Sequence, residues 1–319
     1  MGGLLWLSLG ALSPGEGGNK FDVIWAAWKN SNKGFLLLMS FIGLVSHVMR
    51  AERWRMLLEP SGNRVSLGGS FLSVMVGYLV NLAIPRGGEV SRCYNLYKLD
   101  GAPVETSFGT VVVERIVDVL CLLGVIVVAF ALEWNSLIGF MQSLGIGSGG
   151  SEGGFKIPWW VFAGLIGLAA VAIAVYLLRQ NEKLVKLLSG FKEGLLSVFR
   201  LEKKWMFIFY SVAIWVLYFF MSYSVIQAFD STSGLGFSSV LTLFALGAIA
   251  MAAPLPGGTG SYHTIVPAGL VMLYSIDKQD AITFVFIFHA WQTLNFIVLG
   301  LISLIISYFV IRWKKQPIK

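Results

Sequence analysis

The chain has 319 residues, of which 56% are hydrophobic and only 13% are charged, and this composition excludes an ordinary water-soluble domain. Its net charge of +7 is more typical of membrane topology and contact with anionic lipid than of a nucleic-acid partner, so we expect no nucleic acid to bind. The two cysteines, Cys93 and Cys121, are too few for a disulfide framework and lack the spacing of metal ligands.

Apolar runs near 20 residues long predict a polytopic integral membrane bundle of the all-α class, with a single transmembrane domain over 1–319. The first apolar segment, 1–12, is only about half as long as a bilayer requires. Arg50, Arg53 and Arg55 are expected to close the first complete span. The longer apolar runs predict helices over 35–49, 66–84, 105–132, 159–178, 205–229, 237–253, 262–274 and 281–311, with a polar return at 90–99 and a glycine–serine loop at 145–154.

Residues 181–204 differ in kind from the apolar runs. Leu184, Leu188 and Leu195 fall on one face of a helix, and Lys183 and Lys192 fall on the other. This pattern predicts an amphipathic helix that lies on an anionic membrane surface.

Two apolar helices end in a proline–glycine break, at 85–88 and again at 254–260. Proline lacks an N–H and disfavours helical angles in the residue before it, so the first of these helices is expected to stop at Ile84. Each break is followed by a short return, an acidic cap and a helix that carries polar side chains. We therefore predict two repeats, over about 66–132 and 238–304.

Lysine and arginine counts predict how the repeats are oriented. Three segments are basic: residues 50–65 contain four lysines and arginines, residues 179–204 contain seven, and the tail from Arg312 contains four. By contrast, residues 133–157 contain one and residues 229–236 contain none. If residues 66–99 enter and leave the membrane on one face, and residues 237–274 do the same on the other face, then all basic segments and the C-terminus are cytoplasmic. If either segment crossed the membrane, the basic segments would lie on opposite sides. We therefore predict inverted repeats, each with a re-entrant hairpin broken at a proline–glycine tip near the midplane. The exceptions would be Lys20, Lys29 and Lys33, on the external side.

Charged residues inside the predicted repeats mark the candidate site. Glu114 lies about 15 Å of helix beyond Val104, near the middle of a bilayer, where charge is expensive and usually functional. The half-helix N–H groups at the first tip, together with Arg86 and Arg92, suit an anion such as a lipid phosphate. Alternatively, these arginines simply neutralise buried carboxylates. The candidate substrate-binding residues are Asn81, Arg86, Gly87, Gly88, Glu89, Arg92, Glu114, Arg115, Asp118, Gly257, Gly258, His263, His289 and Gln292.

Several short motifs are weak signals one by one but together resemble a known protein family. They are 50–58 (RAERWRMLL), 77–81 (GYLVN), 85–92 (PRGGEVSR), 114–118 (ERIVD) and 256–263 (PGGTGSYH), with His289 and Gln292. Together they resemble the transmembrane region of the lysylphosphatidylglycerol synthase family, from about Phe21 onward. The resemblance implies a bacterial-type inner-membrane protein that moves an aminoacylated, anionic or glycosylated lipid between leaflets. No soluble aminoacyl-transferase domain is present, so we expect no synthase activity.

Two other functions stay open at this point. One is a membrane transferase acting on a polyprenyl or glycolipid substrate with Glu114 or Asp118 as base, although no Asp-x-Asp metal motif or nucleotide-binding loop accompanies them. The other is a scaffold for a separate lipid-modifying enzyme. The three histidines are too scattered in sequence to indicate a metal site, and we expect no metal and no cofactor.

Overall fold

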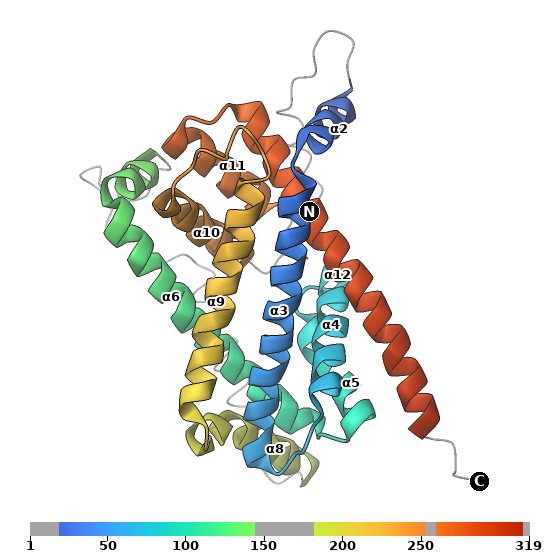
Figure 1. Cartoon of the computed structure of the whole chain (residues 1–319). Coiled ribbons are helices and arrows are strands. Elements are labelled where there is room, and N and C mark those ends of the chain that lie inside the picture. The colour runs from blue at the N-terminus through green and yellow to red at the C-terminus, as the bar shows by residue number, and fades with distance from the viewer. Residues whose placement is uncertain (1–18, 144–181, 253–259, 315–319) are drawn as a thin grey trace.

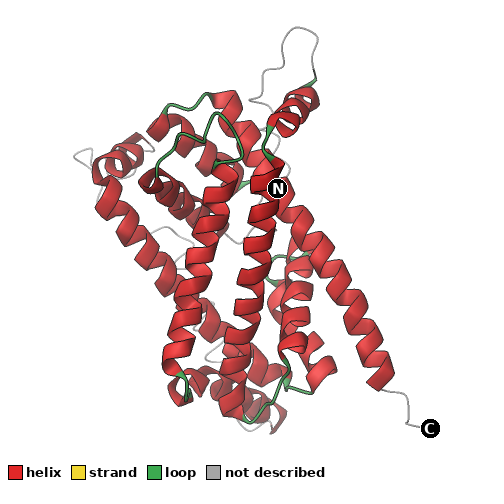
Figure 2. Ribbon diagram, in the orientation of Figure 1, coloured by secondary structure: helices red, strands yellow, loops and turns green. Residues whose placement is uncertain are grey.

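A computed structural model describes residues 19–143, 182–252 and 260–314. Within these ranges the chain is helical and contains no strand (Figure 2), so the predicted all-α class is confirmed there. Several predicted features lie outside the described residues: the apolar segment 1–12, the loop 145–154, the span 159–178, and Gly257 and Gly258 of the second tip.

Four of the described helices are long and apolar enough to cross a membrane: α3 (Lys33–Leu58), α6 (Val104–Ser143), α9 (Lys204–Ile226) and α12 (Lys278–Lys314). At 1.5 Å per residue each exceeds the ~30 Å hydrocarbon core of a bilayer. The chain is therefore an integral membrane protein. Figure 1 shows α3 and α9 side by side in the middle of the molecule, with α6 and α12 crossing it at a slant.

The outward faces of the long helices are apolar. On α6, Val119, Leu120 and Val127 are exposed, and on α12 so are Ile302 and Ile305. In a water-soluble protein such continuous apolar faces would drive aggregation, whereas in a bilayer they contact lipid chains.

Two ends of the predicted spans need correction. The span predicted over 35–49 continues through Arg50, Arg53 and Arg55 to Leu58, because the first two of these arginines face the protein interior rather than a loop. The helix predicted to stop at 132 continues to Ser143 through a kink at Glu133, whose φ of −129° and ψ of 38° are not helical. Upstream, residues for which no helix was predicted form α2 (Lys20–Asn30), and the Asn19 side chain caps it.

The first proline–glycine break separates α4 (Leu67–Ala83) from α5 (Gly87–Asp100). Ile84, before the proline, is extended at φ −122° and ψ 108°, as predicted, and Arg86 takes the left-handed φ of 63°. The chain thereby reverses, and the two helices pack along each other. Their contact is so close that a Cβ on Gly88 would lie 2.1 Å from the carbonyl oxygen of Gly77. Glycine is required at this point of the hairpin.

The second helix pair consists of α10 (Phe237–Ala252) and α11 (Ser261–Tyr274), which also pack on each other. The α4–α5 pair packs on α12, where a Cβ on Gly300 would meet the Leu79 side chain at 2.6 Å, and the α10–α11 pair packs on α6 and on the start of α12. Each short pair thus rests on the long helix that follows the other pair. Figure 1 shows the two pairs at opposite ends of the molecule. That they are re-entrant and related by inversion stays a prediction.

The amphipathic segment forms α8 (Glu182–Leu196) followed by the 3₁₀ turn η2 (Ser197–Arg200). It does not lie free on a surface, because α8 packs tightly against the start of α6. A Cβ on Gly194 would lie 2.3 Å from the carbonyl oxygen of Thr106. Phe191 stacks near Phe108, with 6.3 Å between ring centroids, so this part of the apolar face contacts protein. Basic side chains such as Lys192 and Arg200 remain exposed.

Candidate functional site

Six charged side chains from three helices meet inside the bundle, beside the tip of the α4–α5 pair. They are Arg50 and Arg53 of α3, Arg92 of α5, and Glu114, Arg115 and Asp118 of α6. Arg53 Nη2 lies 3.1 Å from Glu114 Oε1 and 2.7 Å from Asp118 Oδ1, and Arg50 pairs with Asp118 as well. Arg92 Nη2 lies 2.5 Å from Glu114 Oε2. The ion pairs join α3, α5 and α6.

Sequence spacing explains why these groups converge. Arg50 and Arg53 are three residues apart on α3, and Glu114 and Asp118 are four apart on α6, so each pair shares one helix face. Arg55, two positions further on, points to the surface instead and pairs with Glu52 at 2.6 Å. Only this third arginine closes the span in the way that the sequence predicted.

Arg92 is buried and contacts other side chains of the protein. Its guanidinium lies over the Trp54 ring, 4.6 Å from the ring centroid, and the Trp54 indole N–H donates to Thr110 Oγ1 at 2.9 Å. Glu114, its ion-pair partner, has no exposed surface at all. The contacts of Arg92 therefore agree with the alternative in which it neutralises a buried carboxylate. They hold α5 against α3 and α6.

The network carries more positive than negative charge. Four arginines face two carboxylates, an excess of two positive charges, and the tip residues Arg86 and Glu89, whose charged atoms lie 3.9 Å apart, leave that excess unchanged. Uncompensated charge in a membrane interior is costly unless a counter-ion joins it. The site therefore suits a bound anion.

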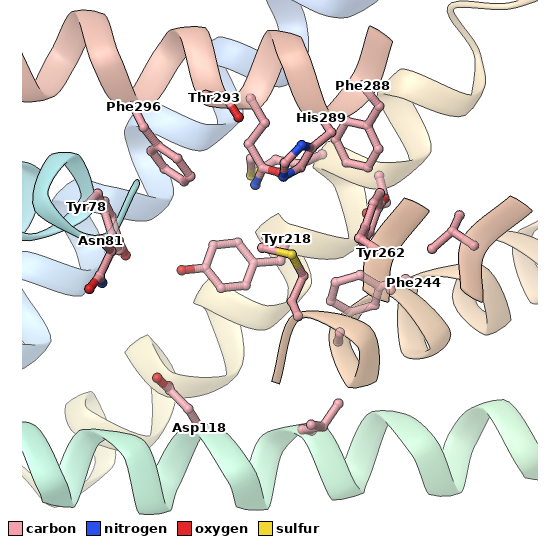
Figure 3. A pocket seen from close by; sticks show the side chains of 18 of the residues that line it. Tyr78, Asn81, Asp118, Tyr218, Phe244, Tyr262, Phe288, His289, Thr293 and Phe296 are labelled. Atoms are coloured by element: carbon pink, nitrogen blue, oxygen red, sulfur yellow. The ribbon is translucent and has the colours of Figure 1, made fainter. Parts of the chain in front are cut away.

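A cavity of about 580 Å³ adjoins this network. It lies between the tip of α4–α5, the middle of α6 and α9, and the helices α10, α11 and α12. Arg50, Arg115 and Asp118 line one side, and Arg86 and Glu89 line it from the tip. Figure 3 shows Asp118 rising from α6 on one side and His289 and Phe296 reaching in from α12 on the other. The aromatic side chains of its wall include Tyr78, Tyr218, Phe244, Tyr262, Phe288 and Phe296.

The predicted site residues divide into two groups around this cavity. His263 lies behind His289, with 4.7 Å between the ring centroids, and Gly87 and Gly88 form the first turn of α5. Arg92 and Glu114 are ion-paired behind the wall. The predicted residues that do line the cavity are Asn81, Arg86, Glu89, Arg115, Asp118, His289 and Gln292.

The N–H groups at the first tip are already bonded within the protein. Gly88 N donates to Asn81 Oδ1 at 2.8 Å, Gly87 N donates to the Ile84 carbonyl at 3.0 Å, and Glu89 N donates to the Arg86 carbonyl at 3.3 Å. These three N–H groups therefore donate within the protein, and phosphate binding by the tip backbone stays a prediction. Arginine side chains, rather than backbone N–H groups, are left to meet an anion.

Sequence reasoning missed several polar residues that line the cavity, among them His47, Arg50, Tyr78 and Tyr218. His47 and Arg50 are three residues apart on α3, a spacing that signals a shared polar face within an apolar helix. Tyr218 accepts a hydrogen bond from Arg50 Nη1 at 2.9 Å across 168 positions of sequence. A local sequence pattern cannot predict that Arg50 and Tyr218 are hydrogen-bonded, because they are so far apart along the chain.

The sequence was compared with known protein families, curated proteins and solved structures. The profile of the lysylphosphatidylglycerol synthase TM region matches residues 3–300, which include every residue that lines the cavity. Among curated proteins, the UPF0104 membrane protein MJ1595 of Methanocaldococcus jannaschii is 27% identical over 160 residues, which cover 49% of this chain and 43% of that protein. The match therefore spans less than half of that relative's length. No solved structure matches.

Proposed function

This chain belongs to the lysylphosphatidylglycerol synthase TM region family, and we propose that it binds the phosphate of an anionic phospholipid in the cavity and carries the lipid between leaflets. The observation that supports this most is the excess of two arginine charges beside the cavity. Guanidinium groups bind phosphate through paired, charge-assisted hydrogen bonds. Arg50 and Arg115 both line the cavity and would contact that phosphate.

The cavity also suits the rest of a lipid head group. Its volume of about 580 Å³ is within the range of ~300–1,000 Å³ typical of small-molecule sites. Its aromatic wall would contact the glycerol and the first methylenes of the acyl chains, while the chains themselves extend along the exposed apolar face of α6.

We propose that α4–α5 and α10–α11 are re-entrant hairpins of inverted repeats. The helices α4 and α5 have 17 and 14 residues, about 25 and 21 Å, too short for a ~30 Å hydrocarbon core. The reciprocal packing of each pair on the long helix of the other repeat supports the same arrangement. Half-helices that meet at a central site are typical of transporters, in which one repeat moves against the other.

The orientation that we propose places the C-terminus in the cytoplasm of a cell with a bacterial-type inner membrane. Lys314 lies 3.6 Å from Asp100, so the end of α12 and the base of the α4–α5 pair share one end of the molecule. Figure 1 shows the end of α3 and α8 at this same end, with α2 at the other. These segments carry most of the exposed lysine and arginine, which favours the cytoplasmic side. There, Lys192 and Arg200 would contact anionic lipid.

We propose a role without catalysis by the buried carboxylates. A general base must reach a substrate proton, and Glu114 is fully buried and ion-paired with Arg53 and Arg92. Asp118 lines the cavity but is held by three arginines, which stabilise its ionised form. The transferase alternative therefore gains no support from these side chains.

The proposal is tested in proteoliposomes that contain fluorescent phosphatidylglycerol, with dithionite added outside to bleach exposed label. Arg115→Gln is the informative variant, because Arg115 lies 3.8 Å from Asp118 and its loss leaves the shorter ion pairs intact. Wild type should bleach label beyond the outer leaflet, and Arg115→Gln should do so about tenfold more slowly. Arg64→Gln, at an exposed position far from the cavity lining, is the control and should match wild type. Equal rates in Arg115→Gln and wild type, or bleaching of the outer leaflet alone by inserted wild-type protein, would contradict the proposal.

A further inference from the structure

The cavity presents a set of uncharged polar groups that phosphate binding does not use. They come from three helices and face the same space as the arginines: His47 of α3, Tyr218 of α9 and Gln292 of α12. His47 and Gln292 also line a small recess that adjoins the main cavity, so these two side chains are neighbours. The set is defined by these three residues and is called the neutral polar group below.

His47 is buried without a hydrogen-bond partner for its Nδ1 atom among the described residues. Only 5% of the residue is exposed, and its ring packs against Tyr78 and Phe296, at centroid distances of 5.0 and 5.7 Å. Leaving a buried polar atom unpaired costs free energy, and such atoms in native proteins commonly await a ligand or a water molecule. The aromatic neighbours fix the ring beside the cavity.

Tyr218 and Gln292 offer further hydrogen bonds. The Tyr218 oxygen accepts from Arg50, so its own proton remains available, and Figure 3 shows the hydroxyl pointing into the open space of the cavity. The Gln292 amide lines the cavity and can both donate and accept. Together with His47, these groups can bind an uncharged ligand group that itself donates and accepts, which is the chemistry of a hydroxyl.

Both carboxylates of the cavity lie near arginine side chains. Asp118 is held by Arg50, Arg53 and Arg115, and Glu89 sits in the first turn of α5 near Arg86, where the helix dipole also favours its charge. Among the described residues that line the cavity, these two are the acidic ones. The arginines that line the cavity, Arg50, Arg86 and Arg115, outnumber these two carboxylates, and their net positive charge repels an ammonium group.

We infer that the neutral polar group binds hydroxyls of the head group while the phosphate lies against Arg50 and Arg115. The preferred substrate class is then a lipid phosphodiester whose head carries uncharged hydroxyl groups, as glycerol or a sugar does, rather than one whose head carries an ammonium. This inference rests on the proposed function and adds the chemistry that selects among anionic lipids.

Three short-chain lipids separate the contributions in a binding measurement on the full-length protein in detergent. Dioctanoyl phosphatidylglycerol and dioctanoyl phosphatidylethanol have the same charge and differ in the two hydroxyls and one carbon of the head group, while dioctanoyl phosphatidylethanolamine carries the ammonium. Phosphatidylglycerol should bind about tenfold more tightly than phosphatidylethanol, and phosphatidylethanolamine should bind most weakly. Tryptophan fluorescence titration would report the affinities.

Two variants assign the preference to the neutral polar group. His47→Phe keeps a ring packed against Tyr78 and Phe296, and Gln292→Leu keeps the approximate shape of that side chain. Each should weaken phosphatidylglycerol binding about threefold to tenfold and leave phosphatidylethanol binding unchanged. Tyr223→Phe, on the same helix as Tyr218 but outside the cavity lining, is the matched control and should leave both affinities unchanged.

The outcomes distinguish the two proposals. Equal affinity for phosphatidylglycerol and phosphatidylethanol, both lowered by Arg115→Gln, would overturn the hydroxyl inference and leave the proposed function standing. Tightest binding of phosphatidylethanolamine would overturn it as well. Binding of none of the three lipids would contradict the proposed function, and the inference would fail with it.

Discussion

Arg53 is an arginine with no exposed surface inside a membrane protein, and its surroundings explain how that is possible. Its Nη2 atom lies within hydrogen-bonding distance of two carboxylates, Glu114 and Asp118, and its Nη1 atom is 3.4 Å from Ser211 Oγ. A buried charge of this kind is tolerated only while its partners remain, because removing one partner leaves the other uncompensated.

Glu114→Gln tests this dependence. The substitution keeps the shape of the side chain but removes the charge that pairs with Arg53 and Arg92, and it should destabilise the fold by about 3 kcal/mol or more. The melting temperature of the detergent-purified protein would measure the loss. Glu59→Gln is the matched control, since Glu59 is half exposed and pairs with Arg55 only at 3.5 Å, and it should melt like wild type. A Glu114→Gln protein as stable as the control would contradict the account of the network.

Sequence analysis found the charged residues of α6 but misplaced those of α3. The depth of Glu114 and Asp118 in an apolar run marks them as buried at once. Arg50 and Arg53 are close to Arg55 in sequence, at the end of an apolar run. Arginines that flank a membrane span occur at the same position, so these two were expected to be exposed. The difference between burial and exposure depends on which side of α3 faces α6, 61 residues or more along the chain, and sequence spacing alone does not carry that information.

At the scale of an element, the α4–α5 hairpin depends on contact between two backbones. Gly88 approaches the Gly77 carbonyl so closely that any side chain must displace one helix, and Asn81 bonds the Gly88 N–H across the turn. Pro85 and the left-handed Arg86 set the direction of the reversal. The hairpin is therefore a rigid unit that positions Arg86, Glu89 and Arg92.

Gly88→Ala should damage this unit. The new Cβ would lie 2.1 Å from a backbone oxygen that no flexible side chain can move aside, so we expect a loss of about 1–3 kcal/mol in stability and weaker binding of phosphatidylglycerol. Gly68→Ala, in the same hairpin with no atom within 4 Å of the added Cβ, should leave stability unchanged or slightly improved. Thermal melting of the two variants side by side gives the comparison. Equal stability of both would show that the helices are not held as described.

Apart from α2, the order and type of the described helices could be predicted, because hydropathy and proline–glycine breaks are local signals. The start of α10 at Phe237 and the end of α11 at Tyr274 agree with the expected 237–253 and 262–274. The packing of α8 on α6 could not be predicted in the same way. It depends on glycines from both helices, Gly109 and Gly194, whose proximity only the fold creates.

At the scale of the whole molecule, the account requires both ends of each hairpin to lie on one face of the membrane. Single cysteines in a background without Cys93 and Cys121 test this with a maleimide that does not cross membranes. Arg64→Cys and Lys98→Cys, at exposed positions near the two ends of α4–α5, should be labelled only after permeabilisation. Ser231→Cys and Lys278→Cys, exposed at the two ends of α10–α11, should be labelled in intact cells. Opposite labelling of the two ends of either pair would exclude a re-entrant hairpin.

The most direct test of the central claim is an electron cryo-microscopy structure of the protein in a nanodisc of phosphatidylglycerol. The account predicts lipid density in the cavity, with the phosphate within about 3.5 Å of the Arg50 or Arg115 guanidinium and the glycerol hydroxyls toward His47 and Gln292. A phosphate at the arginines with its head group turned away from His47 would support lipid binding but not the selection of hydroxyls. A cavity without lipid, with phosphatidylglycerol ordered only on the outer faces of α6 and α12, would contradict the account.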